Sequence, residues 1–171
     1  WHVTYKATMA VYDTVGPSYV RFGRNPAPIV TTEETPFVLG KAAVFRKGCD
    51  VTVFANGMMV HQALTAADAL QQKGISAEVI NVHTVKPLDT QAISKSAAKT
   101  KAVVVCEEHQ CIGGLGSAIC EVLAQHCCVP VELVGIKDTF GESGMPDELM
   151  ETYGLGASSI VQAVQNVLKR K

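Results

Sequence analysis

The stretch that decides the fold covers residues 104–119 and reads V-V-C-E-E-H-Q-C-I-G-G-L-G-S-A-I. An apolar run passes through Glu107, Glu108 and His109 into a glycine cluster, after which a helix begins. The chain around this unit alternates apolar strands with amphipathic helices. Because the connections are short, the crossovers must be parallel, and the pattern predicts an α/β fold with helices on both faces of a sheet. Ligands and partner surfaces gather in such folds where strands end and helices begin.

Five strands and five helices are expected in one domain that begins at residue 40. The strands are predicted over residues 40–46, 50–55, 77–82, 102–106 and 131–136, and the helices over residues 58–73, 90–99, 115–126, 146–152 and 157–170. Gly74 should end the first helix and Asp89 should cap the second, whereas Ser143 and Gly156 lie near the starts of the last two. The tight connection after residue 46 suits an antiparallel hairpin, although the two strands could instead be separated in one mixed sheet.

The first 39 residues are expected to lie outside this domain. A short helix is predicted over residues 3–14 and a short alternating strand over residues 18–22. Residues 23–36 hold three prolines, which suppress both helix and central strand, so a loop is expected there. The upstream part is too short to bury a core of its own. It therefore reads as the tail end of another unit.

Composition excludes several classes of protein. A chain of 171 residues supports one domain with an appended segment. Its net charge of −1 argues against binding to nucleic acid, which normally requires a basic face. The sequence contains no run of about 18 apolar residues, so no membrane span is expected. The start has no charged leader before an apolar run, so a cytoplasmic protein is expected, and a chain beginning with Trp1 suggests a fragment or a processed product.

The six cysteines are expected to be reduced and mainly structural. They form no C-x-x-C pair and have no zinc-ligand spacing with histidine, so no metal site is predicted. Reduced thiols also fit a cytosolic protein. A redox site at Cys111, beside the glycine turn, remains an alternative.

The glycine turn has two interpretations. Glycines after a strand let backbone N–H groups approach an anion at a helix N-terminus, which gives a possible anion site at Gly113, Gly114, Gly116 and Ser117. The run is G-G-x-G rather than the dinucleotide fingerprint G-x-G-x-x-G, and it comes late in the domain. A tight turn with close helix packing is therefore the favoured interpretation.

Polar side chains at strand ends form a second candidate site. Glu108 and His109 end one strand and His83 follows another, a position that suits acid–base chemistry. A solvated edge or a subunit contact explains Glu108 and His109 equally well, and a structural role is favoured for His83. The sequence lacks the G-x-S-x-G of a nucleophile elbow, so we assign no catalytic residue. Arg21 and Arg24, on a loop freed by a glycine, could clamp a phosphate, although solvated arginines are the simpler interpretation.

The motifs resemble those of one family in order. Residues 16–24, G-P-S-Y-V-R-F-G-R, are similar to the segment that closes the pyrimidine-binding domain of transketolases, and 1-deoxyxylulose-5-phosphate synthases end that segment in a similar R-x-x-R. Four later stretches resemble the C-terminal domain of transketolases. They read D-V-T-V-F-A-N-G-M-M-V-H-Q-A-L, I-N-V-H-T-V-K-P-L-D, E-E-H-Q-C-I-G-G-L-G-S-A and G-I-K-D-T-F-G-E-S-G-M-P-D-E-L-M-E-T-Y-G-L. The likeness is closest to the C-terminal subunit of split bacterial and archaeal transketolases.

The resemblance implies an architecture. It gives a three-layer α/β/α sandwich around a five-stranded mixed sheet of order 1-3-2-4-5, with the first strand antiparallel, so the hairpin becomes doubtful. It also divides the chain into the tail of the pyrimidine-binding domain (1–24), a linker (25–39) and the C-terminal domain (40–171).

The resemblance also implies a function. The chain would be the C-terminal portion of a transketolase, a thiamine-diphosphate-dependent enzyme of carbohydrate metabolism and the pentose phosphate pathway that moves a two-carbon ketol unit between sugar phosphates. Thiamine diphosphate and Mg²⁺ would be held by the N-terminal and pyrimidine-binding domains or subunit, and neither by this fragment, which would be inactive alone. Homodimer contacts are expected. One residue carries over: Arg24, matching the arginine that binds the sugar-phosphate end of the substrate.

Other interpretations stay open at this point. The same domain recurs in 1-deoxyxylulose-5-phosphate synthase and in the E1 β subunit of 2-oxoacid dehydrogenases. An anion-binding regulatory or interaction module is the alternative from another class, and a free-standing NAD dehydrogenase is the weakest.

Overall fold

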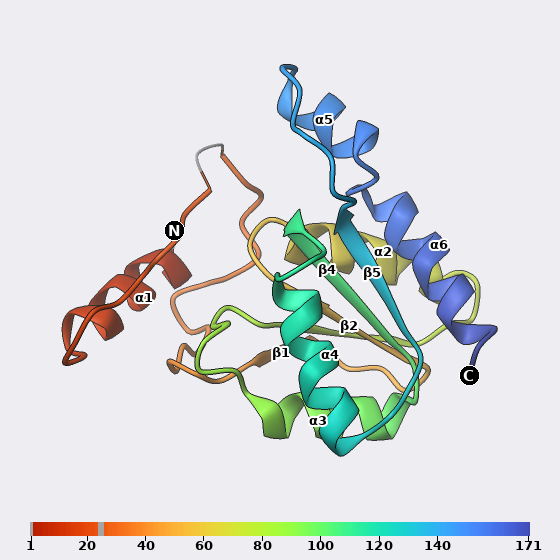
Figure 1. Ribbon diagram of the computed structural model, residues 1–171, viewed down its shortest axis with the longest axis horizontal. Helices are drawn as coiled ribbons and strands as arrows, with labels where there is room; N and C mark the ends of the chain where they lie inside the picture. Colours follow the sequence, from red (N-terminus) through yellow and green to blue (C-terminus); the bar gives the residue numbers. More distant parts are fainter. Residues whose placement is uncertain (1, 24–25) are drawn as a thin grey trace.

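A single five-stranded sheet forms the centre of the protein. The computed structural model describes residues 2–23 and 26–171. The strands are β1 (Ala43–Arg46), β2 (Val51–Ala55), β3 (Ala77–Asn81), β4 (Val103–Gln110) and β5 (Val131–Ile136). They lie in the order β1-β3-β2-β4-β5 (Figure 1). β1 runs antiparallel to β3, whereas β2, β3, β4 and β5 are parallel to one another. The order and direction implied by the resemblance are confirmed.

The hairpin expected between the first two strands is wrong. β3 lies between β1 and β2 and hydrogen-bonds to both of them. β2 is buried along its whole length, from Val51 to Ala55. A strand this buried is more stable between two parallel neighbours than at an edge with one neighbour. β1 takes the edge of the sheet, where Val44 is half exposed. The short connection after β1 therefore crosses β3 instead of folding back.

Helices cover both faces of the sheet, as expected for a three-layer sandwich (Figure 1). The helices of this domain are α2 (Met59–Gln71), α3 (Thr90–Thr100), α4 (Leu115–His126), α5 (Pro146–Thr152) and α6 (Ala157–Leu168). α2 and α6 pack against one apolar cluster, which includes Val53 of β2. α3 and α4 pack against another, which includes Phe54, the next residue of the same strand. Alternate side chains of β2 thus supply two separate cores.

Most helix ends agree with the predicted signals. The Asp89 carboxylate accepts a hydrogen bond from the Ala92 backbone N–H at 3.2 Å and caps α3. Gly74 follows α2 with a φ of +75°, a backbone conformation in which glycine carries no steric cost. The cap predicted near Ser143 is wrong, because α5 begins after Met145 with Pro146 in its first turn.

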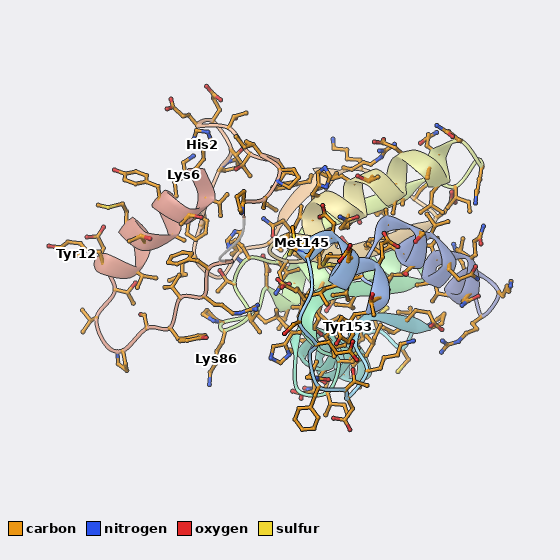
Figure 2. All side chains as sticks on the ribbon, turned by 90° about the horizontal axis from the view of Figure 1, so that it is seen from above. His2, Lys6, Tyr12, Lys86, Met145 and Tyr153 are labelled. Carbon is orange, nitrogen blue, oxygen red and sulfur yellow. The ribbon has the colours of Figure 1, made fainter. Side chains whose placement is uncertain are left out.

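Residues upstream of the sheet form an exposed helix. α1 (His2–Tyr12) has no buried residue, and Figure 2 shows it beside the sheet domain with Tyr12 at its far end. The Lys6 ammonium ties it to the following loop by donating to the backbone carbonyls of Glu33 and Thr35. The strand predicted over residues 18–22 is wrong. Those residues alternate correctly, but no neighbouring strand in the described part of the chain pairs with them.

Two further observations concern residues 2–23 and 26–171. β4 continues to Gln110, four residues beyond its predicted end, so Glu107, Glu108 and His109 lie within the strand. Over the same ranges, no helix is both long enough and apolar enough to cross a membrane.

Candidate functional site

The predicted site residues lie at the carboxyl edge of the sheet. Because β2, β3, β4 and β5 are parallel, their carboxyl ends meet at one edge, past which α5 projects (Figure 1). His83 follows β3, Glu108 and His109 end β4, and the glycine turn comes next. The strand β2 separates β3 from β4. The sheet therefore joins Glu108 and His109 to the glycine turn but holds His83 two strands away.

Glu107 connects β4 to helix α4. Its side chain is only 4% exposed. One carboxylate oxygen accepts from the Leu115 backbone N–H at 2.7 Å, and the other accepts from the Gly116 N–H at 2.8 Å. These are N–H groups of the first turn of α4, which have no partner within the helix. A buried carboxylate is stable here because two hydrogen bonds and the positive end of the helix dipole offset its loss of water.

The glycines of the turn make room for this carboxylate. A Cβ atom on Gly114 would lie 2.1 Å from the Glu107 Oε2 atom, and one on Gly116 would lie 2.8 Å from the Leu133 Cδ2 atom. A Cβ on Gly135 in β5 would approach the Cys111 Sγ atom to 2.9 Å. The G-G-x-G run thus allows close packing of a strand, a helix and an internal acid, in line with the favoured interpretation.

The possible anion site at Gly113, Gly114, Gly116 and Ser117 stays a prediction. The Gly113 N–H donates to the Ser117 Oγ atom at 2.9 Å, and the Ser117 hydroxyl donates to the Cys111 carbonyl at 3.1 Å. The Gly116 N–H is already bonded to Glu107. An external anion would have to displace these partners and approach a buried carboxylate of the same sign, and both changes cost free energy.

His109 and Glu108 face the solvent at the end of β4. The His109 ring is about half exposed, and its Nδ1 atom lies 2.9 Å from the Gln110 carbonyl oxygen and 3.9 Å from the Glu107 Oε2 atom. Glu108 is exposed, and its backbone carbonyl accepts from the Arg21 Nη1 atom at 3.5 Å. Glu108 and His109 could exchange protons with a ligand at this edge, whereas the Glu107 carboxylate is already hydrogen-bonded to α4.

His83 forms part of a separate apolar groove. Its ring stacks on Phe37 with the centroids 4.4 Å apart, and its Nδ1 atom lies 3.0 Å from the Thr84 Oγ1 atom. Burial lowers the pKa of His83 below its usual value. The groove has a volume of about 590 Å³ and is lined mainly by apolar residues of the linker, β1 and α2, with Lys41 as its one lysine. These contacts suit the structural role favoured for His83.

Three predictions concern arginine, metal and cysteine. Arg24 lies outside the described residues, so its predicted role stays a prediction. Within residues 2–23 and 26–171, no group of three or more His, Cys, Asp or Glu side chains could hold a metal ion. All six cysteines belong to the described part of the chain and are free thiols.

Sequence reasoning missed the role of Glu107. It selected Glu108 and His109 because they precede the turn, whereas the residue that organises the turn is the acid before them. One signal was available: the residue before α4 is a glycine, Gly114, which has no side chain to cap the helix. An uncapped helix start a few residues after an acid that follows an apolar run indicates that this acid could bond to the free N–H groups of the helix.

Comparison with known proteins identifies the family. A sequence model of the transketolase C-terminal domain matches residues 40–160. The chain therefore belongs to the transketolase C-terminal domain family, as the resemblance implied.

Particular relatives refine this assignment. The 6-deoxy-6-sulfo-D-fructose transketolase subunit SqwH of Clostridium sp. (strain MSTE9) is 51% identical over 156 residues, which cover 91% of this chain and 48% of that protein. A solved split gene transketolase, described as an inactive beta4 tetramer, superposes with a TM-score of 0.92 and 43% identity over 99% of this chain and 55% of that one. The 1-deoxy-D-xylulose-5-phosphate synthase of Heliobacterium modesticaldum is 41% identical over 89% of this chain and 24% of that protein. The chain thus spans about half the length of the SqwH subunit and of the solved split gene transketolase.

Proposed function

We propose that this chain is the C-terminal portion of a transketolase, which transfers a two-carbon ketol unit from a ketose phosphate to an aldose phosphate. The observation that carries the proposal is the superposition of nearly the whole chain on a split gene transketolase. In the assembled enzyme this portion provides structure and subunit contacts, including contacts within a homodimer, and it is inactive alone. The enzyme acts in the cytoplasm, where its thiols stay reduced.

Thiamine diphosphate and Mg²⁺ belong, in this proposal, to the N-terminal and pyrimidine-binding parts of the enzyme. No group of three or more His, Cys, Asp or Glu side chains in the described part of the chain could hold Mg²⁺. When bound by those other parts, thiamine diphosphate supplies the electron sink for ketol transfer. We derive no step of the reaction from residues of this chain.

Arg24 is proposed to bind the phosphate of the sugar substrate. The support is its match to the family arginine within the R-F-G-R segment of residues 21–24. A guanidinium can bind a phosphate through two parallel hydrogen bonds. Binding energy gained at the phosphate, remote from the reacting carbonyl, orients that carbonyl for reaction.

A 1-deoxyxylulose-5-phosphate synthase is the second candidate, because members of that family are also relatives of this chain. Complementation separates the two. The chain is combined in turn with the missing domains of a transketolase and with those of a synthase, and ketol transfer and synthase activity are both measured. Activity only in the synthase combination would replace the first proposal by the second.

The main test compares the chain alone with the assembled enzyme. Purified alone, it should show no ketol transfer in a coupled assay and no saturable binding of thiamine diphosphate by calorimetry. Adding the polypeptide that supplies the thiamine-binding domains should restore both. Activity or saturable coenzyme binding by the isolated chain, free of contaminating enzyme, would contradict the proposal.

A further inference from the structure

The segment around α5 carries an exposed aromatic side chain beyond the carboxyl edge of the sheet. This segment, called the α5 segment below, covers residues 137–152, from the end of β5 to the end of α5 (Figure 1). Phe140 in its loop is 99% exposed within the described part of the chain. Met145 of the same segment is 66% exposed, and Ile112, on the glycine turn at the same edge, is 75% exposed. Three large apolar side chains therefore face solvent at one edge of the sheet.

The loop that carries Phe140 is held by hydrogen bonds on both sides of that residue. On one side, the Gln110 side chain accepts from a backbone N–H and donates to a backbone carbonyl of residues 138–139, at 2.9 Å and 3.1 Å. On the other side, the Tyr153 hydroxyl donates to the Phe140 carbonyl at 3.1 Å and accepts from the Glu142 N–H at 2.9 Å. Four hydrogen bonds thus fix the backbone beneath a ring that the fold leaves exposed. A side chain fixed in advance binds a partner at a smaller entropic cost.

The α5 segment is strongly acidic. It contains five acidic residues and one basic residue, so its net charge is −4, whereas that of the whole chain is −1. Asp138 and Glu142 lie on either side of Phe140 in the sequence, and both are exposed. Such a surface attracts a positively charged partner surface. It repels a second copy of itself, because a two-fold contact through this segment would bring like charges together.

The tail of the upstream unit reaches the same edge of the sheet. Under the proposed function, residues 1–24 are the tail end of the pyrimidine-binding domain. The Arg21 side chain of this tail donates to the Glu108 carbonyl near the end of β4. Gln110, two residues further along β4, holds the loop of Phe140. A domain that includes the tail therefore lies at the same edge as the loop.

We infer that Phe140 is the apolar anchor by which this chain binds the thiamine-binding domains of the enzyme. The inference rests on the proposed function and names the surface that one of its subunit contacts uses. The matching surface on those domains is an apolar pocket bordered by arginine or lysine side chains. Met145 and Ile112 extend the apolar contact, and Asp138 and Glu142 attract the basic border. Aromatic anchors surrounded by weaker contacts supply most of the binding energy of protein interfaces.

Binding of the full chain to the thiamine-binding domains of a transketolase, prepared as a separate polypeptide, tests the anchor. Phe140→Ala should raise the Kd by about 30-fold, mainly through faster dissociation. Phe140→Leu keeps an apolar side chain and should stay within about fivefold of the wild type. Ketol transfer restored by mixing the two polypeptides should require a correspondingly higher concentration of the Phe140→Ala chain.

Val44→Ala is the matched control for the anchor. It shortens a half-exposed apolar side chain on β1, at the opposite edge of the sheet, and should leave the Kd unchanged. The melting temperature of Phe140→Ala should equal that of the wild type because its ring is exposed, so a weaker affinity does not arise from unfolding. An equal rise in Kd for Val44→Ala and Phe140→Ala would overturn the inference.

Neutralising the two acids beside the anchor tests the role of charge. Asp138→Asn combined with Glu142→Gln keeps the shape of both side chains. The pair should slow association by about fivefold at low salt and should make the association rate less dependent on salt. Glu121→Gln removes an exposed acid from α4 and should change neither quantity. An unchanged association rate in the double variant would contradict a basic partner surface.

The outcomes distinguish this inference from the proposed function. If the wild-type chain binds the thiamine-binding domains and restores ketol transfer, an equal affinity of Phe140→Ala would overturn the inference alone. If Phe140→Ala instead weakened self-association of the isolated chain in analytical ultracentrifugation and bound those domains normally, the surface would belong to a contact between copies, which also overturns it. A wild-type chain that neither bound the domains nor restored ketol transfer would remove the proposed function and the inference with it.

Discussion

The burial of His83 makes the stability of the folded protein depend on pH. The pKa of His83 in the folded protein lies below its ordinary value of 6.5 because burial disfavours the charged ring. The unfolded chain therefore takes up a proton at a higher pH than the folded protein does. The contribution of His83 to stability is fully present above about pH 6.5 and is lost as the pH falls toward the lower, folded pKa. We expect His83→Gln to flatten the fall in unfolding free energy between about pH 7 and pH 5.

Urea denaturation at a series of pH values measures this slope. His126→Gln deletes an imidazole from the exposed end of α4 and serves as the control. An equal change of slope in both variants would show that the groove around His83 does not determine the effect.

Burial also ranks the reactivity of the thiols. Burial and the neighbouring Glu107 carboxylate raise the pKa of Cys106 strongly, and burial raises the pKa of Cys111 and Cys120. Since the thiolate is the reactive form, these residues should react slowly with iodoacetamide. The exposed Cys49 and Cys128 should be labelled first, and Cys106 only after unfolding, as measured by peptide mass spectrometry. Labelling of Cys111 before the exposed thiols would instead favour the redox alternative.

At the level of single residues, the sequence predicted types of role better than partners. The structural interpretation of the glycine turn followed from its departure from the dinucleotide fingerprint, and the cap by Asp89 followed from its position. The partnership of Glu107 with α4 was not assigned, because the predicted strand ended at Cys106 and the lack of a capping side chain at Gly114 was not used. A strand ending at Cys106 would have left Glu107 in solvent, whereas a strand continuing to Gln110 carries it beneath the helix start.

The junction of β4 and α4 depends on the absence of a side chain at Gly114. Gly114→Ala places a Cβ atom 2.1 Å from the Glu107 Oε2 atom, so the carboxylate must leave its two N–H partners. We expect a loss of about 3 kcal/mol in the free energy of unfolding, from steric strain and lost hydrogen bonds. Guanidinium denaturation provides the measurement.

Gly141→Ala is the matched control, because a Cβ atom there meets nothing within 4 Å. Its free energy of unfolding should change by less than about 0.5 kcal/mol. If both variants behaved alike, the junction would not need a glycine at residue 114.

At the level of elements, the periodicity of apolar residues predicted which strands and helices form. The pairing of the strands could not be predicted from that periodicity. The five strands and the helices of the domain follow from apolar spacing, since each buries one face or both. The order of the strands does not follow from it, because any buried strand fits beside any other. The expected hairpin after β1 shows this, and only the resemblance to transketolases indicated the true order. The prediction of a strand at residues 18–22 is wrong for the same reason. An alternating pattern forms a strand only where a neighbouring strand can hydrogen-bond to it.

In the whole molecule, the two parts differ in how much they bury. The sheet domain contains both apolar clusters, whereas α1 has no buried residue. Large exposed side chains, such as Tyr12 and Tyr19, lie upstream of the linker. This contrast supports the proposal that residues 1–24 belong to another unit, which would cover them in the assembled enzyme. The linker differs from both parts, because some of its residues contact the sheet domain.

Truncation tests where the domain begins. The proposed division starts the C-terminal domain at residue 40, yet Val30 packs against one apolar cluster and Phe37 stacks on His83. A chain starting at residue 26 keeps these contacts and loses only α1 and its exposed neighbours. We therefore expect residues 26–171 to unfold cooperatively at the same urea midpoint as residues 1–171. Residues 40–171 should lose about 2 kcal/mol, the value of burying one aliphatic and part of one aromatic side chain.

Point variants in the longer chain control for the truncation. Val30→Ala combined with Phe37→Ala should reproduce most of the loss seen in residues 40–171, because it removes the same packing and keeps the backbone. If residues 26–171 were as unstable as residues 40–171, α1 would stabilise the sheet domain despite having no buried residue, and the link from Lys6 to Glu33 and Thr35 would be the contact responsible. If all three chains were equally stable, the domain would begin at residue 40, because the linker contacts would contribute nothing to its stability.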